Sequence, residues 1–205
     1  MKTCKYKTGF TLVEMLIVVA VIAILISMVI GIASRIENQA KQQLTEGTIA
    51  VLNGALEQFS DYGFRYNDAN YSDFHFPLDC NGFSDIELET ELGGIISGGA
   101  HDANYSGSEA LYFFLSRVPE SRETLDKIDK SLITSKDKNK QDMIITIDDV
   151  NYPLMRIIDP WGTTLRYDYY DEITLDPNSK RNFPVIISAG PDGVFGTDDD
   201  ITNRK

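Results

Sequence analysis

The sequence predicts an α+β fold in which one long N-terminal helix packs against a small antiparallel sheet. Three patterns support this fold: a nearly uniform apolar stretch, an amphipathic stretch with helical periodicity, and short segments of branched and aromatic residues that alternate with turn residues. At 205 residues the chain is long enough for one folded body with an appended helix. The expected parts are a leader (1–9), an apolar helix (10–32), its amphipathic continuation (33–61) and a globular domain (62–205).

The apolar stretch runs from Phe10 to Ile32 and contains Glu14 as its only charged residue. A helix of ~20 apolar residues spans the hydrocarbon core of a bilayer, so this stretch is predicted to be a transmembrane helix. Basic residues that precede such a helix favour keeping its N-terminal side in the cytoplasm. Because Lys2, Lys5 and Lys7 lie there, we expect a single-pass protein of the cytoplasmic (inner) membrane with a periplasmic or extracellular C-terminal domain.

The residues around the start of this stretch differ from a secretory signal peptide. No A-x-A-like cleavage site follows the apolar run, whereas a Gly-Phe junction lies directly before it. The order Gly9, Phe10, Thr11, Leu12, Val13 and Glu14 resembles the signature of the prepilin family, in which a basic leader ends in Gly and is followed by Phe and a Glu five residues into the mature chain. This resemblance implies a type IV pilin-like fold, cleavage after Gly9 by a prepilin peptidase, N-methylation of Phe10, and packing of the helices of many copies into a filament.

Glu14 has a physical role that does not depend on the family. An isolated carboxylate inside a bilayer costs ~2.5 kcal/mol or more, so it requires a partner. The amine of Phe10 in a neighbouring copy is such a partner, and we hypothesise that this pair sets the axial register of each incoming subunit during assembly. The alternative is that Glu14, which lies near the helix end, reaches the membrane surface.

The stretch after Ile32 has the period of an amphipathic helix. It is expected to leave the membrane, to pack on the globular domain and to end near Asp61–Gly63, where Gly63 is a suitable C-terminal stop. The apolar stripe predicted to face the domain comprises Ile36, Ala40, Leu44, Val51, Leu52, Ala55, Leu56 and Phe59.

The globular domain is predicted to contain short elements. The glycine-rich residues 92–100 are expected to be a flexible connection, because they lack the Gly-Lys-Ser/Thr ending of a phosphate-binding loop. A helix capped by Ser106 or Ser108 is expected at 108–118, and a second short helix followed by an exposed charged loop at 120–142. Strands are predicted at 143–147, 153–158, 164–170 and 183–188.

The C-terminal segment from Ser188 to Ile201 is acidic and rich in glycine. A tight loop would bring its carboxylates together, and a hard cation that accepts about six to eight oxygen ligands would relieve their repulsion. Calcium suits such a loop better than magnesium, which demands near-octahedral geometry. The alternative is a solvated acidic tail. The aspartates concerned are Asp192, Asp198, Asp199 and Asp200.

The DPWG run from Asp159 to Gly162, followed by SAGPDG and GTDDDI, resembles the C-terminal half of the major pseudopilins of type II secretion systems. In that family a DPWG turn precedes the final strands and the last loop binds calcium. The resemblance therefore implies a structural calcium ion held by a calcium-type C-terminal loop. It implies the side chains of Asp192, Asp199 and Asp200 as ligands, with Ser188 and the backbone carbonyl of Phe195 as further candidates.

Composition and spacing exclude several functions. The net charge of −12 repels nucleic acid, so no nucleic-acid partner is expected. His75 and His101 have no partner at the spacing of a catalytic or zinc site, so the protein is predicted not to be an enzyme. Cys80 is the only cysteine outside the leader and is expected to be a partly buried small side chain.

The expected function is that of a structural subunit of a type II secretion pseudopilus, which supports protein export. The implied partners are further copies of the chain, the prepilin peptidase, other pseudopilins, the inner-membrane secretion platform and the membrane itself. Two alternatives remain at this point. One is a type IV pilin for adhesion or motility, although such pilins often close their last loop with a disulfide that Cys80 alone cannot form. The other is a membrane-anchored binding protein or enzyme with a prepilin-like anchor.

Overall fold

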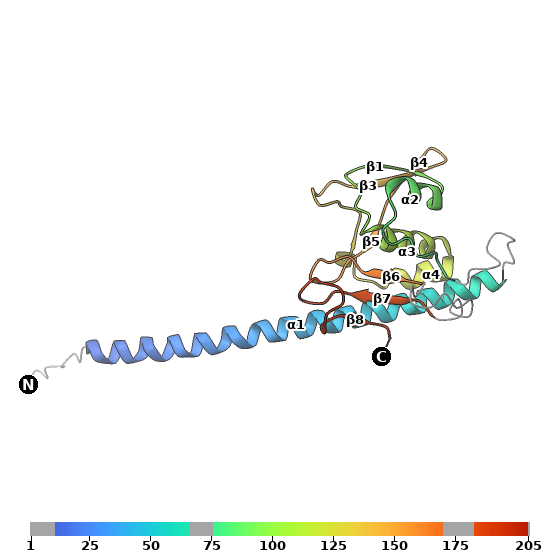
Figure 1. The fold of residues 1–205 in the computed structure, drawn as a ribbon. Coiled ribbons are helices and arrows are strands. Elements are labelled where there is room, and N and C mark those ends of the chain that lie inside the picture. The colour runs from blue at the N-terminus through green and yellow to red at the C-terminus, as the bar shows by residue number, and fades with distance from the viewer. Residues whose placement is uncertain (1–10, 66–75, 170–182, 205) are drawn as a thin grey trace, which may run out of the picture. The chain divides into compact units, whose positions relative to one another are not determined.

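The computed structural model describes residues 11–65, 76–169 and 183–204, apart from the side chains of residues 28–34 and 63–65. The chain divides into two compact units, Met1–Ala40 and Lys41–Lys205. The larger unit holds all strands of the described residues, together with the C-terminal part of the first helix (Figure 1). The fold is α+β, as the sequence predicts.

Helix α1 extends from Leu12 to Arg65, which confirms the prediction of one long N-terminal helix. No proline interrupts these residues. The helix continues past Gly63, where the sequence suggested an end. A glycine inside a helix costs only ~1 kcal/mol relative to alanine, so the neighbouring turns can carry the helix through it.

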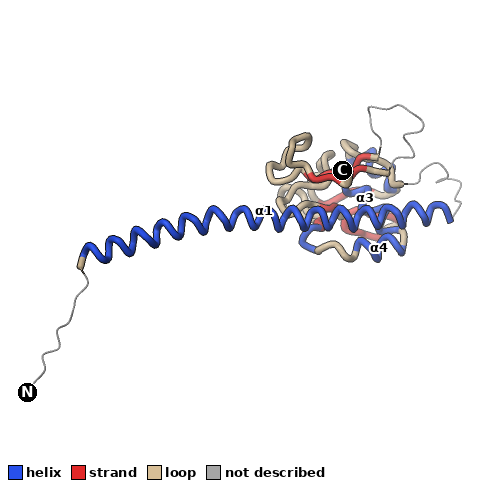
Figure 2. The backbone as a smooth tube through the Cα atoms, turned by 90° about the horizontal axis from the view of Figure 1, so that it is seen from below, coloured by secondary structure: helices blue, strands red, loops and turns tan. Residues whose placement is uncertain are grey.

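Within the larger unit, α1 buries one face against the domain, and Figure 2 shows this part of the helix beside α3 and α4. Leu44 was expected on this face, but it is 42% exposed. That part of the prediction is wrong because Thr45 and Thr48 begin the buried face instead. Ile36 and Ala40, which were also expected in the stripe, belong to the smaller unit and are exposed. The hydroxyls of Thr45 and Thr48 donate hydrogen bonds to the backbone carbonyls of Lys41 and Leu44, respectively, at 2.9 Å each. The buried residues of this face are Thr45, Thr48, Ile49, Leu52, Ala55 and Leu56.

Within the described residues, three small sheets replace the single sheet that the sequence suggested, and all of their strand pairs are antiparallel. Each strand is only two to five residues long. The first sheet has the order β1-β3-β4, the second pairs β2 with β5, and the third has the order β6-β7-β8. Their bounds are β1 Ile95–Gly98, β2 Ile133–Thr134, β3 Met143–Ile147, β4 Val150–Pro153, β5 Arg156–Ile157, β6 Arg166–Asp168, β7 Val185–Ser188 and β8 Ile201–Thr202.

Strand β1 lies within residues 92–100, which were expected to be a flexible connection. This expectation is wrong because the segment has a partner: Ile96 pairs with Ile145, and Gly98 pairs with Met143. A side chain on Gly98 would meet the carbonyl oxygen of Asp142 at 2.2 Å, so the glycine allows the two backbones to approach. The glycines of this segment therefore serve close strand packing.

The described part of the larger unit contains four shorter helices. Helix α3 confirms the helix predicted at 108–118, but neither expected serine caps it. The hydroxyl of Ser106 donates to the carbonyl of Phe83 at 3.0 Å, and that of Ser108 accepts from the backbone N–H of Ile157 at 3.0 Å. The helices are α2 Asp85–Leu92, α3 Ser106–Arg117, α4 Pro119–Leu125 and the 3₁₀ turn η1 Lys130–Leu132.

Helix α3 lies between two apolar cores. Leu111 and Leu115 belong to the first core, which α1 also enters through Leu52 and Leu56. Ala110 belongs to the second core, with residues from α2 and β3. Burying a leucine side chain fully is worth ~1.5–3 kcal/mol, so these contacts hold α1 and the sheets against the same helix.

Candidate functional site

The N-terminal end of α1 begins with a capping box. The carboxylate of Glu14 accepts hydrogen bonds from the backbone N–H and the hydroxyl of Thr11, both at 2.8 Å, and the Thr11 hydroxyl accepts from the N–H of Glu14 at 3.3 Å. A negative side chain in the first turn also interacts favourably with the helix dipole. Glu14 thus has a local partner within one chain. The predicted cleavage and methylation positions, Gly9 and Phe10, lie outside the described residues.

Large apolar side chains cover the first turns of α1 on all sides. From Leu12 to Ile26 they are between 49% and 81% exposed. Within the residues that the structure describes, no helix is both long enough and apolar enough to cross a membrane.

The acidic loop, residues 189–200, connects strands β7 and β8 of the third sheet. Its aspartates act mainly as acceptors for the loop's own backbone. Asp199 accepts from the N–H of Asp192 at 3.1 Å and from the hydroxyl of Thr197 at 2.6 Å. Oδ1 of Asp192 accepts a hydrogen bond from the backbone N–H of Val194, and Oδ2 of Asp200 accepts one from the backbone N–H of Gly196. The hydrogen bond from Thr197 is the largest influence that lowers the pKa of Asp199.

The base of the acidic loop is tied to the predicted DPWG turn. Asp159 is 2% exposed, and its Oδ1 accepts from the backbone N–H groups of Trp161 at 3.1 Å and Thr163 at 2.9 Å. Its Oδ2 accepts from the hydroxyl of Ser188 at 2.7 Å, and that hydroxyl accepts from Gly190 at 3.2 Å. Ser188, a predicted calcium ligand, is therefore engaged with Asp159 at the end of β7.

The acidic loop offers oxygen atoms, the ligand type that a hard cation requires. Oδ1 of Asp200 is buried and accepts no hydrogen bond from the described residues, so this oxygen is unsatisfied. Across the described ranges, no three His, Cys, Asp or Glu side chains are grouped so as to hold a metal ion. Phe195, whose carbonyl was a candidate ligand, lies in the loop with its side chain 38% exposed. The oxygen-only donor set fits calcium in type, and the ligand set stays a prediction.

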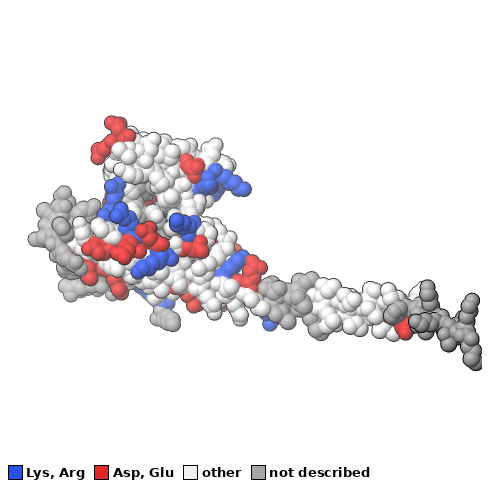
Figure 3. Space-filling view, turned by 180° about the vertical axis from the view of Figure 1, so that it is seen from behind, with Lys and Arg blue, Asp and Glu red and all other residues white. Residues whose placement is uncertain are grey.

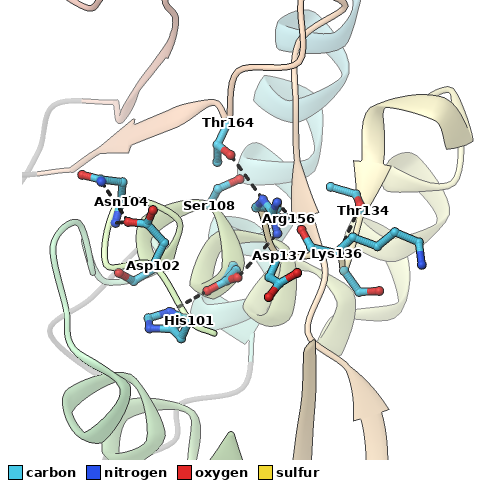
Figure 4. A network of polar contacts seen from close by, with 12 residues as sticks. His101, Asp102, Asn104, Ser108, Thr134, Lys136, Asp137, Arg156 and Thr164 are labelled. Carbon is cyan, nitrogen blue, oxygen red and sulfur yellow. Dashed lines mark hydrogen bonds and ion pairs between the residues drawn. The ribbon is translucent and has the colours of Figure 1, made fainter. Parts of the chain in front are cut away.

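A buried polar network links α2, α3 and β5 (Figure 4). Nε2 of His101 lies 3.0 Å from Oε2 of Glu109, which is fully buried, and Nδ1 lies 2.9 Å from Oδ1 of Asp85. Burial alone would lower the pKa of His101, but the hydrogen bonds and charges of Glu109 and Asp85 outweigh it and raise the pKa. When both nitrogens of His101 are protonated, the imidazolium can donate to both carboxylates, so this charged form crosslinks Asp85 and Glu109.

Arg156 is the cation at the other side of this network. Its Nη1 lies 4.0 Å from Oε1 of Glu109, its Nε donates to the hydroxyl of Thr164 at 3.2 Å, and its guanidinium lies 3.9 Å from the ring centre of Tyr105. Sequence reasoning missed this network because its members are far apart along the chain and no motif joins them. Its contacts connect elements of the fold, which indicates a structural role.

Cys80 is fully buried, as a small core side chain. Burial, together with the nearby charges of Glu91 and Asp79, raises the pKa of its thiol to about 12. The thiolate is the reactive form of cysteine, so Cys80 is unreactive at neutral pH. His75 lies outside the described residues.

Comparison with known proteins shows which proteins this chain is similar to. Residues 4–30 match the family model described as the prokaryotic N-terminal methylation motif. The N-terminal segment, with Thr11 and Glu14 at the start of α1, is therefore similar to this methylation motif. Over 203 residues the chain is 22% identical to type II secretion system core protein G of Escherichia coli (strain K12), an alignment that covers 99% of this chain and 94% of that protein. No solved structure gives a significant match. These findings confirm the resemblance to the type II secretion pseudopilins that the sequence indicated.

Proposed function

We propose that this chain is a structural subunit of a type II secretion pseudopilus, cleaved after Gly9, methylated at Phe10 and polymerised through its N-terminal helix to support protein export. The observation that carries this proposal is the similarity to core protein G over nearly the whole chain, in a protein that also has the methylation motif. The role is structural and needs no catalytic residue.

The surface of α1 supports a role in anchoring and assembly. Large apolar side chains exposed by 49–81% along residues 12–26 are unfavourable in water and require cover. In this proposal the lipid of the inner membrane covers them before assembly, with the N-terminus cytoplasmic and the domain on the other side. The helices of neighbouring copies cover them in the filament. Processing by a prepilin peptidase and contact with other pseudopilins and the inner-membrane platform precede and accompany this step.

Glu14 connects the two states. In the single chain its carboxylate is held by Thr11, through two hydrogen bonds of 2.8 Å. In the filament the amine of Phe10 from a neighbouring copy would replace this neutral partner with a charge, and the pair would set the axial register. The test is Glu14→Ala beside Glu14→Asp, with cleavage and filament yield measured separately. Cleavage should persist in both, whereas the yield should fall most with alanine; wild-type yield for Glu14→Ala rules out the pair.

A calcium ion in the acidic loop is part of the same proposal. The supporting observation is the unsatisfied buried oxygen Oδ1 of Asp200 in a loop whose sequence also contains Asp192, Asp198 and Asp199. The ligands proposed are Asp192, Asp199 and Asp200, with Ser188 and the Phe195 carbonyl as further candidates, and the ion would stabilise a loop with little core of its own.

The calcium proposal is tested by thermal unfolding of the full chain in detergent, with calcium or with a chelator. A ligand at about 100 times its Kd stabilises the folded state by ~2.7 kcal/mol, which is a readily measured shift. Asp200→Asn should lose this shift, and the matched control Asp198→Asn should retain it. Identical melting curves with calcium and with chelator would exclude the site.

The cellular role is tested by deletion of the gene, with secreted proteins and surface motility measured together. Loss of secreted proteins with intact motility is expected for a pseudopilus subunit. Loss of motility with intact secretion would instead assign the chain to a type IV pilus.

A further inference from the structure

A groove opens on the larger unit between helices α3 and α4 and strand β4. Its volume is about 310 Å³, and its walls are mostly apolar and aromatic. Two arginines, Arg117 and Arg122, lie on its helical side, and strand β4 and the following residues form the opposite wall. Residues that line the groove include Phe113, Arg117, Arg122, Tyr152 and Met155.

The two arginines give the groove a positive charge. The guanidinium of Arg117 lies 4.5 Å from the ring centre of Phe113 and 5.6 Å from that of Tyr152, so these rings hold it at the groove. Neither Arg117 nor Arg122 forms an ion pair with a carboxylate of the described residues. On the face of the globular unit in Figure 3, acidic and basic side chains mostly lie next to one another. In a chain of net charge −12, two groove arginines without an ion pair among the described residues, one of them stacked on aromatic rings, are suited to an anionic partner with an apolar part.

The acidic loop has this chemistry. Val194 and Phe195 are 56% and 38% exposed, and they lie between the exposed residues Asp192 and Asp198. The Asp198 carboxylate makes no hydrogen bond or ion pair with the described residues, and it is not among the proposed calcium ligands. The loop therefore presents two apolar side chains next to a free negative charge.

We propose that the groove binds the acidic loop of a second copy of this chain. Val194 and Phe195 enter between Phe113, Tyr152 and Met155, and Asp198 pairs with Arg117 or Arg122. An arginine and a carboxylate can form two parallel hydrogen bonds, which adds direction to the contact. The inference rests on the proposed function, since it requires that copies of the chain assemble.

The contact joins two different surfaces of the unit. The groove is formed by α3, α4 and β4, whereas the loop follows β7 in another sheet. A contact between unlike surfaces repeats from copy to copy and produces rings or open helical filaments. It would thus add a contact between globular domains to the packing of the N-terminal helices.

The first test is disulfide crosslinking of the full chain in assembled filaments. Val194→Cys combined with Met155→Cys should give a ladder of crosslinked copies under oxidation, and each single variant should not. Val194→Cys with Val150→Cys is the matched control, because Val150 is 48% exposed but lies outside the groove. If filaments form but no ladder appears, the inference is overturned and the proposed function stands. A crosslink to a different protein would assign the groove to another partner and would also overturn the inference. If no filament forms, both the inference and the proposed function are overturned.

The second test is a charge exchange. Arg117→Glu should lower filament yield by about tenfold, because like charges across a contact repel, and Asp198→Arg in the same chain should restore it. Lys127→Glu is the control, since Lys127 is exposed on the turn after α4 and does not line the groove. Equal losses for Lys127→Glu and Arg117→Glu, or no rescue by Asp198→Arg, would contradict the proposed pair.

Discussion

Asp159 offers the sharpest test of how the acidic loop is held. It is 2% exposed and accepts three hydrogen bonds, from Trp161 at 3.1 Å, Thr163 at 2.9 Å and Ser188 at 2.7 Å. A hydrogen bond to a charged group contributes ~1.5–3 kcal/mol, and a buried donor that loses its acceptor costs ~1–3 kcal/mol. Because the three bonds share one carboxylate, their contributions overlap, and Asp159→Ala should cost about 3–5 kcal/mol in the free energy of unfolding.

The assay is urea unfolding of the full chain in detergent, followed by the fluorescence of Trp161, the only tryptophan, which lies in the same turn. Asp198→Ala is the matched control, because Asp198 is exposed and its substitution should change the free energy by less than about 0.5 kcal/mol. Asp159→Asn should lie between the two, since an amide oxygen keeps one acceptor for the turn. A loss below about 1 kcal/mol for Asp159→Ala would refute the argument that this carboxylate holds the turn and the loop together.

Two further predictions concern other parts of the larger unit. His101 has a raised folded pKa, so its ion pairs contribute fully below the unfolded value of about 6.5 and are lost as the pH rises through the folded value. His101→Gln should reduce the fall in melting temperature as the pH rises above about 6.5, and an unchanged pH profile would exclude this role. Gly190 has a φ of +62°, and an added Cβ would meet the carbonyl oxygen of Asp199 at 2.3 Å, so Gly190→Ala should destabilise the chain by more than about 2 kcal/mol. Gly193→Ala, with a φ of +70° but its nearest contact at 3.5 Å, should cost only about 1–2 kcal/mol, and equal urea midpoints for the two variants would contradict the steric argument.

Strong periodic patterns and short motifs were predictable from the sequence. The long helix, the helix at 108–118 and strand β3 follow from hydrophobic period and residue type, which act locally. The N-terminal motif needed no structure either, because it is a linear segment, and residues 4–30 match the corresponding family model. An element without a clear local pattern was missed. Strand β1 forms because Ile96 and Gly98 pair with residues of β3.

The candidate sites divide in the same way. The aspartates of the acidic loop lie close together in the sequence, so their chemistry could be predicted, but their hydrogen bonds could not. Only the fold shows that the Ser188 hydroxyl is taken by Asp159, and that one oxygen of Asp200 is left buried and unsatisfied. Whether a carboxylate oxygen finds a hydrogen-bond donor depends on how the loop folds back on the third sheet, and contacts between residues far apart in the sequence decide this.

The sequence by itself determined that the N-terminal segment resembles the methylation motif of prepilins and that it begins a long apolar helix. A helix satisfies its backbone internally, so residue type and spacing are sufficient to predict it. The tertiary structure alone decided that Arg117 and Arg122 share one groove, and that His101, Glu109 and Arg156 form one network. These groupings arise when helices and strands from separate parts of the chain bury a common core, and no local pattern encodes them.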